Sequence, residues 1–186
     1  MHVVSLSGSP SLHSRSAWLL QHAAARIGSR AEAIQHIDLR QLPAQALLAG
    51  DARHPALRAA IEPLLAADVL LVATPIYKAA YSGLLKVFID LLPPDALRHT
   101  SVLPLATGGS AGHFLALDYA LKPVLSALGA RHILDAVYAL DSQLPRDDQG
   151  RYSLADELQQ RLDRALAGLF EPVRRPAATV AVALPC

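Results

Sequence analysis

The segment 8–16, Gly-Ser-Pro-Ser-Leu-His-Ser-Arg-Ser, combines several hydroxyl groups and one guanidinium with no acidic side chain. It follows a short apolar run and precedes a helical pattern, so its free backbone amides should lie at a helix N-terminus. Hydroxyls, free amides and one arginine together suit a phosphate dianion. The Gly-x-x-x-x-Gly-Lys and Gly-x-Gly-x-x-Gly motifs are absent, which favours one phosphate over a triphosphate or a dinucleotide. A capped helix behind a polar loop is the alternative that this composition leaves open.

Two further loops follow apolar runs. Residues 75–83 bring Tyr77, Lys78 and Tyr81 together with several free backbone amides, which could bind the edges of a flat heteroaromatic ring. Lys78 could also favour negative charge on that ring. Residues 107–112 are small, and their glycines would let backbone approach a ring closely. Taken singly, these loops have plainer explanations: packed tyrosines, a solvated lysine or a tight turn. Three such loops at one edge of a sheet favour a ligand site.

The elements that must position these loops alternate along the chain. Short apolar runs predict strands at residues 3–7, 33–39, 68–74, 101–107 and 132–140. Helical spacing predicts helices at residues 14–27, from 55, from 82, at 112–128 and from 153. We expect Pro63 to kink or shorten the second helix, Pro75 to end the third strand, and residues 40–55 to form a loop. Ser153, with Asp156 and Glu157, is expected to open the last helix.

Strands separated by helices imply parallel crossovers and a doubly wound sheet with helices on both faces. The strands are continuously apolar because both of their faces are covered. We therefore predict an α/β fold, a flavodoxin-like five-stranded parallel sheet in the order 2-1-3-4-5, with the ligand crevice where strands 1 and 3 diverge. Residues 1–172 are assigned to this single domain. The Ala/Val/Pro-rich tail 173–186 is expected to be loose or to pack against another subunit.

Composition excludes several classes of protein. The chain has 186 residues, and its one cysteine, Cys186, excludes an internal disulfide framework and a cysteine-based zinc site. A formal charge of +1 argues against a general nucleic-acid binder. The start at Met1 has no basic region typical of a signal peptide, and the apolar stretches fall short of the ~20 residues of a membrane helix. The eight histidines show no metal-ligand spacing. We expect a soluble, intracellular protein with no metal, nucleic acid or membrane partner.

Three blocks resemble the NADPH-dependent FMN reductases, in particular the reductase component of bacterial two-component alkanesulfonate monooxygenase systems. They are residues 8–10 with 14–16, then Ala-Thr-Pro-Ile-Tyr-Lys-Ala-Ala-Tyr-Ser-Gly at 73–83, and Leu-Ala-Thr-Gly-Gly at 105–109. The second block is the most specific. The resemblance continues through residues 118–128 and 141–143, so that it covers about residues 1–170.

This resemblance implies a cytoplasmic enzyme that uses NADPH to reduce FMN and passes the reduced flavin to an FMN-dependent alkanesulfonate monooxygenase. It implies that the FMN phosphate is held by Ser9, Ser14, Arg15 and Ser16. It implies that the isoalloxazine is lined by Pro75, Ile76, Tyr77 and Lys78. It places three more residues beside that ring: Thr107, Gly108 and Gly109.

The resemblance also implies a homo-oligomer, a dimer or tetramer, with Tyr119 at the subunit interface in an inserted π-helical position that influences flavin release. The residues supply a physical reason for a weak point there. Pro123 lies four residues later and cannot donate to the carbonyl of Tyr119, so the helical ladder is broken at this place. An ordinary packed tyrosine is the alternative.

The chemistry requires little of the side chains, because hydride passes from nicotinamide C4 to flavin N5. The protein must stack the two rings at about 3–3.5 Å. We therefore predict no catalytic acid or base. Two alternatives remain open: an enzyme that keeps its FMN and reduces quinones, azo dyes or metal oxyanions, and a non-catalytic flavodoxin-like electron-transfer protein. The charge of +1 disfavours the latter, because such carriers usually dock through an acidic face.

Overall fold

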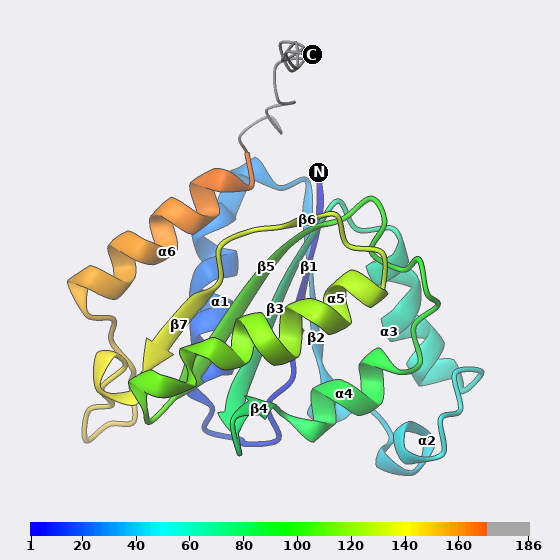
Figure 1. Ribbon diagram of the computed structural model, residues 1–186, viewed down its shortest axis with the longest axis horizontal. Helices are drawn as coiled ribbons and strands as arrows, with labels where there is room; N and C mark the ends of the chain where they lie inside the picture. The colour runs from blue at the N-terminus through cyan, green and yellow to red at the C-terminus, as the bar shows by residue number, and fades with distance from the viewer. Residues whose placement is uncertain (171–186) are drawn as a thin grey trace, which may run out of the picture.

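A central, mostly parallel sheet organises the chain (Figure 1), and the computed structural model describes residues 1–170. The strands run in the order β2-β1-β3-β5-β6, with β7 also paired to β5 and a short β4 paired to β3. Their bounds are β1 His2–Ser7, β2 Ala33–Asp38, β3 Val69–Tyr77, β4 Ala80–Tyr81, β5 Ser101–Gly108, β6 His132–Ile133 and β7 Val137–Leu140. The predicted flavodoxin-like class is confirmed. The predicted tail at 173–186 lies outside the described residues.

The sheet has seven strands rather than the predicted five, because the last strand is split and β4 is added. The amide of Leu134 donates to the carbonyl of Val102 at 2.9 Å, so the backbone N–H and C=O of Val102 in β5 point toward β6 and β7. Pro104, two residues further, faces the same side and has no N–H to donate. The edge strand is interrupted opposite Pro104, which explains why β6 and β7 are separate.

Strand β3 continues through Pro75 to Tyr77, so the prediction that this proline ends the strand was wrong. The last bond from the β1 side runs from the amide of Gly8 to the carbonyl of Ala73 at 2.8 Å. Pro75 faces the same side two residues later, where β1 has already left the sheet. Its missing N–H therefore costs no ladder bond, while its pairing with Thr107 of β5 continues.

Helices cover both faces of the sheet. One face packs against α1 (Arg15–Ile27) and α6 (Asp156–Gly168). The other packs against α2 (Ala44–Leu48), α3 (Pro55–Leu65), α4 (Gly83–Ile89) and α5 (Lys122–Ala127), and Phe88 is fully buried in that layer. None of the described helices combines the length and apolarity needed to cross a membrane.

Several predicted helix limits need correction. The expected loop at 40–55 contains α2, a single turn too short to show periodicity but anchored by buried Ala46 and Leu47. Helix α3 continues two residues beyond Pro63, whose missing amide removes only the bond to the carbonyl of Ala59. The last helix begins at Asp156 behind Ala155 rather than opening on Ser153. The predicted helix at 112–128 is divided into a 3₁₀ turn, a π-helical turn and α5.

Candidate functional site

Three loops meet at the carboxyl ends of β1, β3 and β5 and line a pocket of about 230 Å³. The pocket lies where β1 and β3 diverge, which is the crevice expected for this sheet order. All of the predicted flavin-site residues except Ser16 and Lys78 line it: Ser9, Ser14, Arg15, Pro75, Ile76, Tyr77, Thr107, Gly108 and Gly109. The structure thus brings together residues up to 100 positions apart in the sequence.

The loop after β1 presents oriented hydroxyls at the start of α1. Ser14 caps the helix by accepting the amide of Ala17 at 3.1 Å. Its Oγ also lies 3.0 Å from the Oγ of Ser16, which is fully buried. Ser16 therefore contacts Ser14 and does not line the pocket. Ser9 Oγ accepts the amide of Ser11 at 3.2 Å. Such hydroxyls at a helix N-terminus fit the donor requirements of a phosphate.

Arg15 is held by the segment that follows β7. Its Nε donates to the carbonyl of Leu144 at 3.3 Å, and its Nη1 lies 3.9 Å from Oδ2 of Asp141. Its guanidinium also lies 5.9 Å from the centre of the Tyr152 ring. These contacts limit the rotamers of a long side chain, so the cation is positioned at the pocket before any anion arrives.

The same segment also supports the loop at residues 8–16, which follows β1. The hydroxyl of Tyr152 donates to the carbonyl of His13 at 3.2 Å, and its ring packs against Trp18 at 5.9 Å between centroids. Trp18 in turn stacks on His22 at 5.1 Å within α1. The residues beyond β7 therefore belong to the site, although they lie more than 120 positions from the loop that they support.

Buried hydrogen bonds join the first two loops. The hydroxyl of Thr74 donates to the carbonyl of Pro75 at 3.0 Å and accepts the amide of Ser82 at 2.9 Å. The hydroxyl of Ser82 donates to the carbonyl of Gly8 while capping α4 through the amide of Leu85. Because every partner is buried, this network fixes the distance between the two walls of the pocket.

A tight hairpin connects β3 to β4 at the mouth of the pocket. Lys78 and Ala79 both have positive φ, 51° and 62°, although neither is glycine. Two successive left-handed residues form the turn that matches strand twist, where Asn-Gly is usually preferred. The turn places Lys78 at an exposed position outside the pocket lining, beside half-exposed Tyr77.

Replacing Ala79 by glycine should raise the free energy of unfolding by about 0.5–1 kcal/mol, because glycine removes the steric cost of the left-handed backbone. Urea denaturation measures the change. Ala80→Gly provides the matched control: Ala80 lies in β4, where glycine should lower stability. Equal effects of the two substitutions would contradict strain at Ala79.

The third wall of the pocket depends on Gly108. Tyr138, on the neighbouring β7, places its hydroxyl against Gly108 and donates to the carbonyl of Ser110 at 2.7 Å. A Cβ at position 108 would overlap this hydroxyl. Burial raises the pKa of the Tyr138 phenol, and the negative charge of Asp141 raises it further. The phenol thus remains a neutral donor that holds the loop.

Three lining residues were not among those predicted: Ser11, His13 and Asp141. Ser11 and His13 belong to the loop at residues 8–16, for which the sequence predicts phosphate binding. Asp141 had a usable signal, because it directly follows β7 and so stands at a carboxyl end of the same sheet. The rule that located the other loops would therefore have found it.

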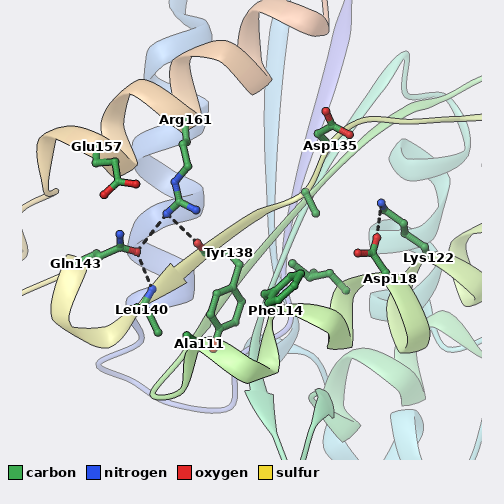
Figure 2. A pocket seen from close by; sticks show the side chains of 12 residues that line it. Ala111, Phe114, Asp118, Lys122, Asp135, Tyr138, Leu140, Gln143, Glu157 and Arg161 are labelled. Atoms are coloured by element: carbon green, nitrogen blue, oxygen red, sulfur yellow. Dashed lines mark hydrogen bonds and ion pairs between the residues drawn. The ribbon is translucent and has the colours of Figure 1, made fainter.

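Figure 2 shows the residues that line a larger cavity of about 390 Å³. One of them is Tyr138, whose hydroxyl lies against Gly108 of the first pocket. On one side, Nη2 of Arg161 donates to the carbonyl of Tyr138 at 3.1 Å and to Oε1 of Gln143 at 3.2 Å. On the other side, Lys122 pairs with Asp118 at 2.5 Å. Its lining contains none of the predicted flavin residues. Lys122 is ion-paired, whereas Arg161 bonds only neutral oxygens through Nη2, and its buried Nε has no hydrogen-bond partner among the described residues. The smaller pocket is the one whose lining contains the residues predicted to hold the flavin. Among residues 1–170, no cluster of His, Cys, Asp and Glu is placed to hold a metal ion.

A π-helical turn, η4 (Leu117–Leu121), borders this larger cavity. The amide of Lys122 donates to the carbonyl of Leu117, the i to i+5 spacing of a π-helix. Pro123 follows and offers no amide to the preceding turn. The π-helical conformation implied by the resemblance is therefore present. Tyr119 lies in it with 79% of its surface exposed, near half-exposed Phe114 and Leu115.

Comparison with known proteins gives a consistent result. The family model described as "NADPH-dependent FMN reductase" matches residues 1–144. An Escherichia coli K12 protein named "FMN reductase (NADPH)" is 47% identical over 94% of this chain and 91% of its own. A Pseudomonas putida protein of the same name is 44% identical over 89% and 85%. The apo crystal structure of an NADH:FMN oxidoreductase superposes with a TM-score of 0.81 at 41% identity, covering 90% of this chain and 87% of that one.

Proposed function

Because this chain belongs to the NADPH-dependent FMN reductase family, we propose that it supplies reduced FMN to a partner monooxygenase that desulfonates organosulfonates. The chain is an oxidoreductase whose reactants are FMN and NADPH. The transfer of the product to a monooxygenase, and the residues that hold the flavin, belong to the proposal. The resemblance of the three loops to the reductases of alkanesulfonate monooxygenase systems supports the choice of partner.

The pocket at the carboxyl ends of β1, β3 and β5 fits FMN. Ser9, Ser14 and Arg15 supply the hydroxyl and guanidinium donors for its phosphate, and Ser16 supports Ser14 from below. Residues 75–77 and 107–109 line the space for the ring, while exposed Lys78 follows them outside the lining. When bound, FMN accepts the hydride of the nicotinamide. The chain orients the two reactants and needs no acid or base for that transfer.

The observation that carries the proposal is that the site is open to solvent and that the charge of its arginine is partly offset by a neighbouring carboxylate. Arg15 is already paired with Asp141, both side chains being between a third and a half exposed. Tyr77 at the ring end is 49% exposed. A site of this kind favours a flavin that enters, is reduced and leaves. An enzyme that retains FMN and reduces quinones or azo dyes would need a more enclosing site.

Steady-state oxidation of NADPH and NADH, with FMN, FAD and riboflavin as acceptors, tests the activity. We expect purified protein that is colourless or pale and that reduces added FMN. Addition of a purified FMN-dependent alkanesulfonate monooxygenase and an alkanesulfonate should then release sulfite in proportion to the NADPH consumed. A yellow protein with ping-pong kinetics towards a quinone, and no sulfite, would favour the retaining reductase instead.

We also propose that the chain forms a homo-oligomer, a dimer or tetramer, through the surface around Tyr119. Replacing Tyr119 by alanine should change the oligomeric state and the rate of flavin release more than the affinity for FMN. The reason is that an exposed aromatic on a π-helical turn gains most of its burial from a second subunit. Size-exclusion chromatography with and without FMN measures the first effect. Leu48→Ala, at an equally exposed apolar residue on α2, is the control. A wild-type elution profile for Tyr119→Ala would reject the interface.

A further inference from the structure

An acidic residue stands among the groups that suit an anion. Among the described residues that line the flavin pocket, Asp141 is the only carboxylate. Its Oδ2 lies 3.9 Å from Nη1 of Arg15, the one arginine of that pocket, and 3.8 Å from the position of a Cβ on Gly109. It therefore faces both the cation and the glycine loop. An acid at this place opposes the anion that the other groups attract.

The backbone holds Asp141 in this position. It begins a 3₁₀ turn, Asp141–Gln143, directly after β7. The side chain of Gln143 folds back to accept the amide of Leu140 at 3.1 Å and is itself bound by Arg161 (Figure 2). The amide of Leu144 donates to the carbonyl of Asp141 at 3.2 Å. Within residues 1–170, Arg15 is the only cation paired with its carboxylate.

The negative charge of Asp141 is expected to weaken the binding of a phosphate beside Arg15. A phosphate that approaches Arg15 must also approach Asp141, and like charges at such separations repel measurably even near the surface. Asp141 also competes with the phosphate for the N–H groups of the Arg15 guanidinium. Both effects weaken binding of a phosphorylated ligand, and neither acts on a neutral flavin. Burial raises the pKa of the nearby Tyr138 phenol, and the negative charge of Asp141 raises it further.

We propose that Asp141 tunes the affinity of the site for the FMN phosphate downward, so that reduced FMN dissociates. This inference rests on the proposed function, since it assumes that the phosphate lies beside Arg15. Asp141 is a specificity-determining residue that contacts no reacting atom. The other groups of the site favour tight binding of FMN. By weakening that binding, Asp141 lets FMN exchange as a substrate.

The test compares FMN with riboflavin, which lacks the phosphate, in the full-length protein. Dissociation constants come from quenching of flavin fluorescence, and dissociation rates from stopped-flow displacement. Asp141→Asn should bind FMN roughly five- to twentyfold more tightly, release it correspondingly more slowly, and bind riboflavin within about twofold of wild type. Raising the salt concentration should reduce the gain. Asp148→Asn is the matched control, because it removes an exposed charge from the same segment without lining the pocket.

Selective tightening of FMN by Asp141→Asn, absent in Asp148→Asn, would support the inference. Equal changes for both flavins, or weaker FMN binding, would overturn it. If Arg15→Ala still weakened FMN selectively in that case, the proposed function would stand while the role of Asp141 fell. If neither Arg15→Ala nor Asp141→Asn altered the preference for FMN over riboflavin, the phosphate site and this inference would fall together.

Discussion

Replacing Arg15 by alanine should weaken FMN binding by about 1.5–3 kcal/mol, because a hydrogen bond to a charged phosphate contributes on that order. This corresponds to roughly a 10- to 150-fold rise in the dissociation constant at 25 °C. The side chain is positioned for this role by Leu144 and Asp141, so little rotamer freedom remains to be lost on binding. Titration of flavin fluorescence gives the constant directly.

Riboflavin is the internal control for Arg15→Ala. Its affinity should change little, because the ring end of the pocket is lined by residues of the other two loops. Thermal unfolding of the variant guards against a general loss of structure, since Arg15 also contacts the segment after β7. An unchanged FMN dissociation constant in a folded variant would reject Arg15 as the phosphate ligand.

Replacing Gly108 by alanine should lower the free energy of unfolding by about 1–3 kcal/mol and impair FMN reduction, because the new methyl group overpacks a filled site. The Cβ would overlap the hydroxyl of Tyr138, which is buried and held by the carbonyl of Ser110. Either Tyr138 or the loop must move, and the loop forms a wall of the flavin pocket. Urea denaturation and NADPH oxidation with FMN measure the two effects.

Two variants test this explanation. Gly109→Ala places its methyl group no nearer than 3.8 Å to Asp141, an ordinary contact, and should be close to wild type in stability. Tyr138→Phe removes the obstructing oxygen, so the double variant with Gly108→Ala should recover part of the loss. If Gly108→Ala and Gly109→Ala were equally mild, the close approach of Tyr138 would not be the constraint that we describe.

The parts of the fold that could be predicted are those whose local sequence pattern agrees with the tertiary packing. Apolar runs between helical patterns predicted a parallel sheet, because strands covered on both faces are continuously apolar. The strand order was predicted from the flavodoxin-like arrangement of a five-stranded doubly wound sheet. Ser14 was recognisable as the start of α1, and its capping bond is present. The π-helical turn was implied by resemblance and made plausible by Pro123. The prediction from Pro75 was wrong because strand pairing decided the outcome, and this proline lies inside β3. The predicted strand at 132–140 was wrong in another way, since it is broken opposite Pro104, from which nothing had been predicted.

The sequence by itself determined which residue types stand at the carboxyl ends of β1, β3 and β5. From those residue types we predicted that this edge of the sheet binds a phosphate and a flat ring. Parallel strands bring their carboxyl ends together whatever the helices between them do. The tertiary structure decided which of those residues reach the pocket: Ser16 is buried beneath Ser14, and Lys78 is turned outward by the hairpin. The sequence could indicate that Asp141 follows a strand, but only the tertiary structure placed it against Arg15, 126 positions away. That pairing depends on how β7 pairs with β5 and on the turn that follows β7, which no local pattern in the chain records.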